Sequence, residues 1–150
     1  MTIALVWLLQ DLFQVVAAET LLVPDLFLLG LLVFGASEKL PPQGLLWSAF
    51  VGGLFWDVRW TGLFGFTAFL DVVAVWFFVE LWGRIPQAGR TPFLLFFLAL
   101  GLHVFVGLGH FLSWAELKPM ESLFVNQQIL ALPIVVFIGW WGCRGTRGDE

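Results

Sequence analysis

Two histidines in the second half of the chain have the residue type and spacing that come closest to a cofactor site. His103 and His110 lie seven positions apart, so a helix would place both on one face. Such a pair can ligate a haem or a metal ion from a single helix. Gly107 and Trp114 extend the same stripe, and small and aromatic residues at this spacing are typical of close helix packing. We therefore interpret the pair as part of an interhelical contact and expect no cofactor.

Two carboxylates fall inside apolar stretches, where ionisation is costly. Asp71 lies one helical turn after Thr67, and Asp11 is followed on its own helix face by Gln14. Each carboxyl is either protonated and hydrogen-bonded inside the protein, or ionised and facing a polar cavity. A proton or ion pathway needs a longer series of titratable groups than this chain offers. We interpret both residues as polar contacts between helices.

The sharpest local pattern is a short apolar segment that ends in an aspartate. Ala49, Gly53 and Asp57 are spaced four apart, so they share a helix face on which the two small residues allow another helix to approach closely. Asp57 must face protein or water, and it can cap the next helix across a turn containing Gly62 and Gly65. A structural turn is the preferred interpretation, with partner contact as the alternative. No catalytic role is assigned, because no base, nucleophile or metal-ligand set accompanies the carboxylate.

The composition places these residues in a lipid bilayer. Hydrophobic residues make up 60% of the chain and charged residues 12%. A backbone that crosses a bilayer must form a helix or a closed barrel, and the apolar runs lack the alternation of barrel strands. At roughly 20 residues per crossing, the sequence predicts an all-α polytopic bundle of about six transmembrane helices with short loops. A net charge of −4 with scattered charges argues against nucleic-acid binding.

Prolines, glycines and polar clusters divide the chain into six apolar segments. We expect one helical domain over residues 1–143 and a short cytoplasmic tail over 144–150. The third segment is short for a full crossing, so it could instead form a re-entrant pair with the second. The expected helices cover residues 2–18, 26–36, 44–57, 63–82, 93–115 and 123–142.

The positions of lysine and arginine predict the orientation of the bundle. Cytoplasmic loops retain these residues. With six crossings and a cytoplasmic N-terminus, the outer side carries only Arg59 and Lys118. The sequence therefore predicts that both termini are cytoplasmic. The basic residues then on the cytoplasmic side are Lys39, Arg84, Arg90, Arg144 and Arg147.

The segment from Pro24 to Gly65 resembles the MreD family of rod shape-determining membrane proteins. Pro24 and Asp25 precede an apolar helix, Gly53 and Asp57 end a short one, and Gly65 follows that aspartate by eight residues. The length and the near absence of loops also agree. The chain departs from the family pattern at Val23 and over residues 58–61.

The resemblance implies a non-enzymatic, multi-pass protein of the bacterial plasma (inner) membrane. Its partners would be MreC, a RodA-type glycosyltransferase and a penicillin-binding transpeptidase, which together direct peptidoglycan synthesis along the side wall. The layout is also similar to the substrate-binding components of energy-coupling-factor vitamin transporters. In that alternative, Asp57, Arg59, Glu116 and Asn126 would be the candidates for a vitamin pocket.

A protein with so little outside the bilayer acts through its lipid-facing surfaces. We expect the small-residue face at Ala49 and Gly53 to receive a transmembrane helix of MreC. On that hypothesis, Gly53→Leu weakens association with the partner more than it harms insertion.

Overall fold

The structure is a computed structural model that describes residues 2–17, 23–113 and 120–142. This part of the chain is all-α, as predicted. It contains six α-helices, a π-helical turn and a short 3-10 helix. Their bounds are α1 Thr2–Ala17, α2 Leu26–Ala36, α3 Pro42–Trp56, η1 Asp57–Thr61, α4 Phe66–Arg84, η2 Gln87–Gly89, α5 Pro92–Ser113 and α6 Met120–Gly142.

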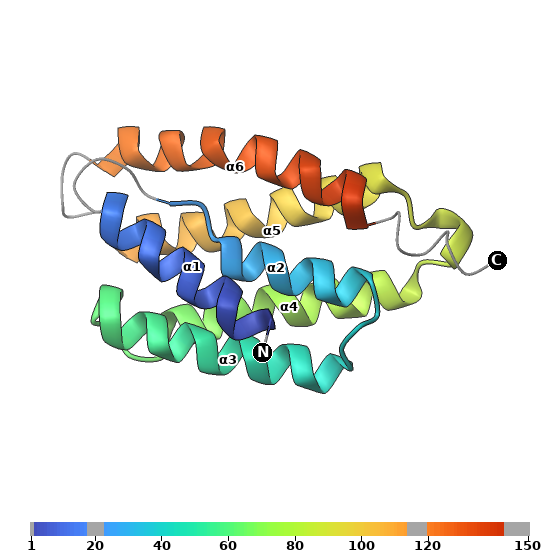
Figure 1. Cartoon of the computed structure of the whole chain (residues 1–150), viewed down its shortest axis with the longest axis horizontal. Helices are drawn as coiled ribbons and strands as arrows, with labels where there is room; N and C mark the ends of the chain where they lie inside the picture. The colour runs from blue at the N-terminus through green and yellow to red at the C-terminus, as the bar shows by residue number, and fades with distance from the viewer. Residues whose placement is uncertain (1, 18–22, 114–119, 143–150) are drawn as a thin grey trace.

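The short helix α2 lies at the centre of the bundle (Figure 1), in contact with each of the other five α-helices. Its sequence is apolar all the way round, and a helix of this kind is stable only when every face is covered. At about 1.5 Å per residue, it is also much shorter than the hydrocarbon core of a bilayer. Its buried side chains are Phe27, Leu28, Leu29, Leu31, Leu32 and Ala36.

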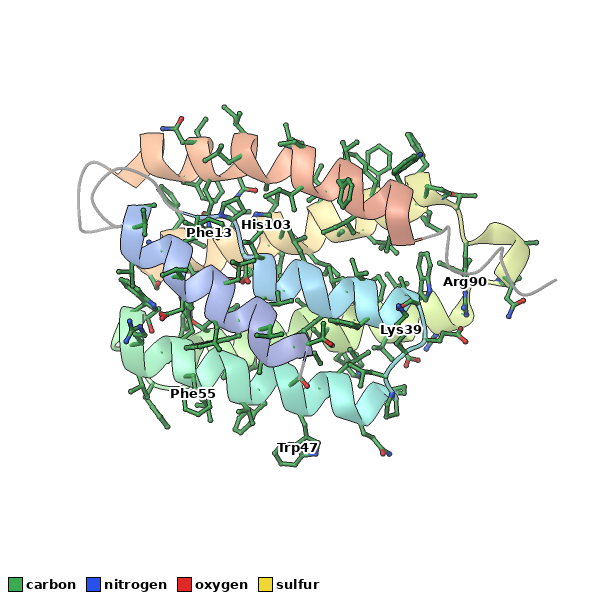
Figure 2. All side chains as sticks on the ribbon, in the orientation of Figure 1. Phe13, Lys39, Trp47, Phe55, Arg90 and His103 are labelled. Atoms are coloured by element: carbon green, nitrogen blue, oxygen red, sulfur yellow. The ribbon has the colours of Figure 1, made fainter. Side chains whose placement is uncertain are left out.

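Helix α1 has the reverse polarity of a helix on a water-soluble protein. Its two buried residues are Gln10 and Gln14, whereas Leu12 and Val16 are exposed, Val16 by 78%. The same preference appears on α3, where Trp47 and Phe55 project away from the bundle, and on α5, where His103 lies between helices (Figure 2). Apolar side chains outside and amides inside suit a surface covered by lipid rather than by water.

Two helices, α4 and α5, are long and apolar enough to cross a membrane. Helices α1 and α2 and the stretch Phe124–Trp140 of α6 are apolar but shorter. The helical class is thus confirmed, while six crossings and the orientation stay predictions. The predicted tail over 144–150 lies outside the described residues.

The predicted helix bounds differ from the structure mainly around Asp57. The α-helical part of α3 ends at Trp56, and the chain continues as the π-helical turn through Thr61. Helix α4 begins at Phe66, three residues later than predicted, because Gly62 and Gly65 both adopt left-handed backbone angles, with φ of +67° and +86°. These conformations are open to glycine at little cost and interrupt the helix.

Candidate functional site

The Asp57 carboxylate caps helix α4 from the end of α3. It is fully buried and accepts hydrogen bonds from the backbone N–H of Thr67, at 3.0 and 3.1 Å, and from that of Ala68, at 3.4 Å. The Thr61 hydroxyl donates a fourth, at 2.8 Å. The first N–H groups of a helix have no partner within the helix, and the helix dipole favours a negative charge there. The predicted capping role of Asp57 is therefore confirmed.

Gly53 provides the close contact that brings α3 and α4 together. A Cβ atom at Gly53 would lie 2.4 Å from the Cα and 2.6 Å from the backbone nitrogen of Ala68. Ala49, one turn earlier, is completely buried. The small-residue face predicted from the sequence exists, but α4 of the same chain covers it. The expectation that this face receives a partner's helix is therefore wrong at Gly53, and Gly53→Leu would disrupt the bundle itself.

Asp25 plays the corresponding capping role at the start of α2. Its Oδ1 accepts a hydrogen bond from the backbone N–H of Leu28 at 2.9 Å. Pro24, immediately before it, is buried, and its carbonyl accepts from the N–H of Leu26 at 2.8 Å. Burial raises the pKa of the Asp25 carboxyl above its usual value, and the hydrogen bonds from Leu28, Gln10 and Phe27 offset part of that increase.

Asp11 joins α1 to the π-helical turn. Its Oδ1 forms an ion pair with Nε of Arg59 and accepts a hydrogen bond from Nε1 of Trp60 at 2.9 Å. The Asp11 side chain is 15% exposed and that of Arg59 is 51% exposed. The interpretation of Asp11 as a contact between elements is confirmed.

A cavity of about 90 Å³, lined by both polar and apolar side chains, lies at the end of the bundle where α1 ends and α4 begins. Its polar lining consists of three glutamines, two histidines, Asp25 and Thr61, contributed by α1, the segment before α2, η1, α5 and α6. The rings of Trp56 and Trp60 form another part of the wall, with their centroids 5.9 Å apart. The volume has room for several water molecules or a small polar molecule.

The three glutamines hold the backbone that leads into α2. Gln10 Oε1 accepts from the N–H of Phe27, and Gln14 Oε1 accepts from the N–H of Val23 at 3.2 Å. From the opposite side, Nε2 of Gln127 donates to the carbonyl of Val23 at 3.0 Å. Backbone groups here have no helical partner, so the amides supply the hydrogen bonds that a non-aqueous setting requires. These contacts fix the mouth of the cavity.

The two histidines predicted to share a face both line the cavity. His110 Nε2 lies 3.0 Å from the hydroxyl oxygen of Thr67 on α4. His103 is 1% exposed, and among the described residues neither of its ring nitrogens has a hydrogen-bond partner. Gly107, between them, packs against α6, since a Cβ there would lie 2.8 Å from Nε2 of Gln128. The packing interpretation thus holds at Gly107, whereas the histidines line the cavity.

Asp71 is buried on α4, with 2% of its surface exposed. Its Oδ1 has no hydrogen-bond partner in the part of the chain that the structure describes, so the hydrogen bond expected for an interhelical contact is not found at this oxygen. Asp71 also interacts electrostatically with Asp25 and Asp57. Three carboxyl groups therefore share one end of the bundle.

The cavity was not predictable from the sequence, because its lining comes from elements far apart in the chain. The available signal was Gln10 and Gln14, four residues apart in an otherwise apolar helix, since such a pair forms one polar stripe. Gln127 is the middle residue of a polar triplet over 126–128, and nothing in the sequence distinguishes it from its two neighbours. Of the residues proposed for a vitamin pocket, Asp57 and Arg59 are engaged elsewhere, and Glu116 lies outside the described residues.

Comparison of the chain with protein-family models, with curated proteins and with solved structures finds no match.

Proposed function

We propose that the chain is a multi-pass protein of the bacterial inner membrane and a non-enzymatic scaffold of the elongation machinery. In this role it positions MreC, a RodA-type glycosyltransferase and a penicillin-binding transpeptidase for peptidoglycan synthesis during rod-shaped growth. Both termini would lie in the cytoplasm.

One observation carries the proposal: the residues on which the resemblance to the MreD family rests are joined in one structural unit. Asp25 caps α2, and Asp57 caps α4. Gly53 lets α3 approach the start of α4, and Gly65 supplies the left-handed residue before it. Residues that build a fold together are expected in a family defined by its bundle rather than by a reaction.

The distribution of polar groups supports a non-enzymatic role. The carboxylate of Asp57 and the amides of Gln10, Gln14 and Gln127 are engaged in holding backbone N–H and C=O groups. Groups committed in this way stabilise the bundle. Exposed apolar side chains, including Trp47, leave lateral contact as the main way to act on another membrane protein.

The placement of basic residues supports cytoplasmic termini. Lys39 and Arg90 lie at the same end of the bundle in Figure 2. Arg84 ends α4 and so lies at that end too, whereas Arg59 lies on the π-helical turn at the other. An excess of lysine and arginine marks the cytoplasmic side of a membrane protein.

The outer surface of α4 and α5 offers a groove for a partner's transmembrane helix. The groove has a volume of about 330 Å³ and is lined by apolar residues, among them Phe77, Phe97 and Phe105. Gly101 belongs to its lining, and a Cβ atom there would meet nothing within 4 Å. A small residue at an open position permits close approach of another helix. This groove replaces the Gly53 face as the surface offered to MreC.

The proposal is tested by affinity purification from the membranes of the native host, with partners identified by mass spectrometry. Wild type should retain MreC, the glycosyltransferase and the transpeptidase. Gly101→Phe fills the groove and should reduce recovered MreC severalfold. Gly83→Phe is the matched control, because Gly83 is also open to its surroundings but lies outside the groove lining. Equal recovery of MreC from both variants would refute the groove as the MreC contact. Absence of all three partners from the wild-type purification would refute the scaffold role.

The same purification separates this proposal from the alternative of a vitamin transporter. Recovery of a transmembrane coupling protein with paired ATPases would indicate vitamin uptake. The cavity argues against that alternative, because about 90 Å³ is well below the 300 to 1,000 Å³ typical of pockets for drug-sized ligands.

A further inference from the structure

The cavity has features that the scaffold role does not use. Its described lining contains one carboxylate, Asp25, and no lysine or arginine. Arg59, the nearby cation, is paired with Asp11 on α1. A cationic guest would therefore meet one acidic side chain and no cationic side chain in the described lining.

His103 provides an independent sign that the cavity has a hydrogen-bonding guest. A neutral imidazole carries one donor and one acceptor nitrogen, and leaving both without partners in a buried site costs free energy. At 1% exposure, His103 lines the cavity with both nitrogens unpartnered among the described residues. A guest that carries a hydrogen-bond acceptor would satisfy the donor nitrogen of the ring.

The remaining walls restrict the kind of cation. Trp56 and Trp60 line the cavity, and the guanidinium carbon of Arg59 lies over the Trp60 ring, 5.6 Å from its centroid. Aromatic rings attract organic ammonium groups, and Trp56 offers such a ring. Within the described residues no group of three histidine, cysteine or acidic side chains is placed to hold a metal ion. The volume of about 90 Å³ exceeds the needs of a bare ion but limits a guest to a few heavy atoms.

We propose that this cavity binds a small primary ammonium group, with Asp25 as its counter-ion and His103 as a hydrogen-bond partner. The ammonium donates to the Asp25 carboxylate and packs against Trp56. A neighbouring hydroxyl or ester oxygen of the guest accepts from His103. Two sources carry this chemistry: a free small amine, and the headgroup of an ethanolamine phospholipid.

The test uses the full chain in dodecyl maltoside micelles and titration calorimetry with ethanolamine. Ethylene glycol is the matched probe, because it has the same number of heavy atoms and no charge. Ethanolamine should bind saturably and at least about tenfold more tightly than ethylene glycol, as expected for a charged hydrogen bond. Equal binding of the two probes, or no saturable binding of ethanolamine, would overturn the proposal and leave the cavity filled by water.

Variants assign the binding to named groups. Asp25→Asn keeps an oxygen that can cap α2 but removes the charge, and should weaken ethanolamine binding about tenfold or more. His103→Leu should also weaken it. Glu80→Gln is the control, because Glu80 is an exposed carboxylate paired with Arg84 at the other end of α4. Unchanged binding in both cavity variants would contradict the assignment even if wild type binds.

Nanodiscs distinguish the two sources of the ammonium. If the guest is a lipid headgroup, ethanolamine should bind several times more weakly in phosphatidylethanolamine nanodiscs than in phosphatidylcholine nanodiscs, because the lipid competes. Equal affinity in the two membranes would identify a free amine as the guest. Neither result depends on the recovery of MreC, so the scaffold proposal stands or falls separately.

Discussion

The sharpest consequence of the structure concerns Asp57, whose carboxylate joins the π-helical turn η1 to α4. Removing it with Asp57→Ala takes away the acceptor for the N–H groups of Thr67 and Ala68 and for the hydroxyl of Thr61. The carboxylate is fully buried, so water cannot replace it without a local opening of the bundle. We expect the variant to lose the fixed geometry of the turn between α3 and α4.

The size of the effect follows from the contacts. The hydrogen bonds to Thr67 are short, whereas the 3.4 Å contact with Ala68 is weak. Leaving buried donors unsatisfied costs about 1–3 kcal/mol each, and the loss of a helix cap costs about 0.5–2 kcal/mol. These contributions overlap, so we expect Asp57→Ala to lower the free energy of unfolding by about 3–4 kcal/mol. Asp57→Asn keeps one acceptor oxygen and should cost about half as much.

The assay is unfolding of the full chain in mixed micelles of increasing SDS content, followed by circular dichroism. Amide hydrogen exchange at Thr67 and Ala68 reports the same bonds locally and should accelerate in Asp57→Ala. Glu80→Ala is the control, because its exposed ion pair with Arg84 contributes less than about 1 kcal/mol. If Asp57→Ala unfolds at the same SDS fraction as this control, the capping argument is refuted.

Two further predictions use the same unfolding assay. Gly53→Ala should lower the free energy of unfolding by at least about 2 kcal/mol, because its Cβ would collide with the backbone of α4. Gly101→Ala should leave the free energy of unfolding unchanged or raise it slightly, because its Cβ would meet open space. Similar effects of the two substitutions would contradict the close approach of α3 and α4 at Gly53. Burial raises the pKa of Asp25 in the folded protein above its usual value, so the neutral carboxyl stabilises the fold at low pH. This contribution is lost as the pH rises through the pKa of the folded state. The stability of wild type relative to Asp25→Asn should therefore fall with rising pH, and a difference independent of pH would exclude the effect.

The local features of the fold were readable from the sequence because their causes are local. Proline and aspartate set the start of α2, and its predicted end at residue 36 agrees with the structure. The role of Asp57 as a cap was predictable because a carboxylate that ends a short apolar helix has few other satisfactory positions. Composition alone indicated helices with apolar outer faces, since lipid imposes backbone hydrogen bonding within each segment.

The partners of each helix were decided only by the tertiary structure. Helices that are apolar on all sides carry no periodic signal for an inner face, so nothing in the sequence marked α2 as the central helix or α4 as the occupant of the Gly53 face. The same holds for the cavity, where His103 on α5 meets glutamines from the two ends of the chain. Such a site depends on contacts between residues up to about a hundred positions apart, and helical spacing within one segment cannot specify them.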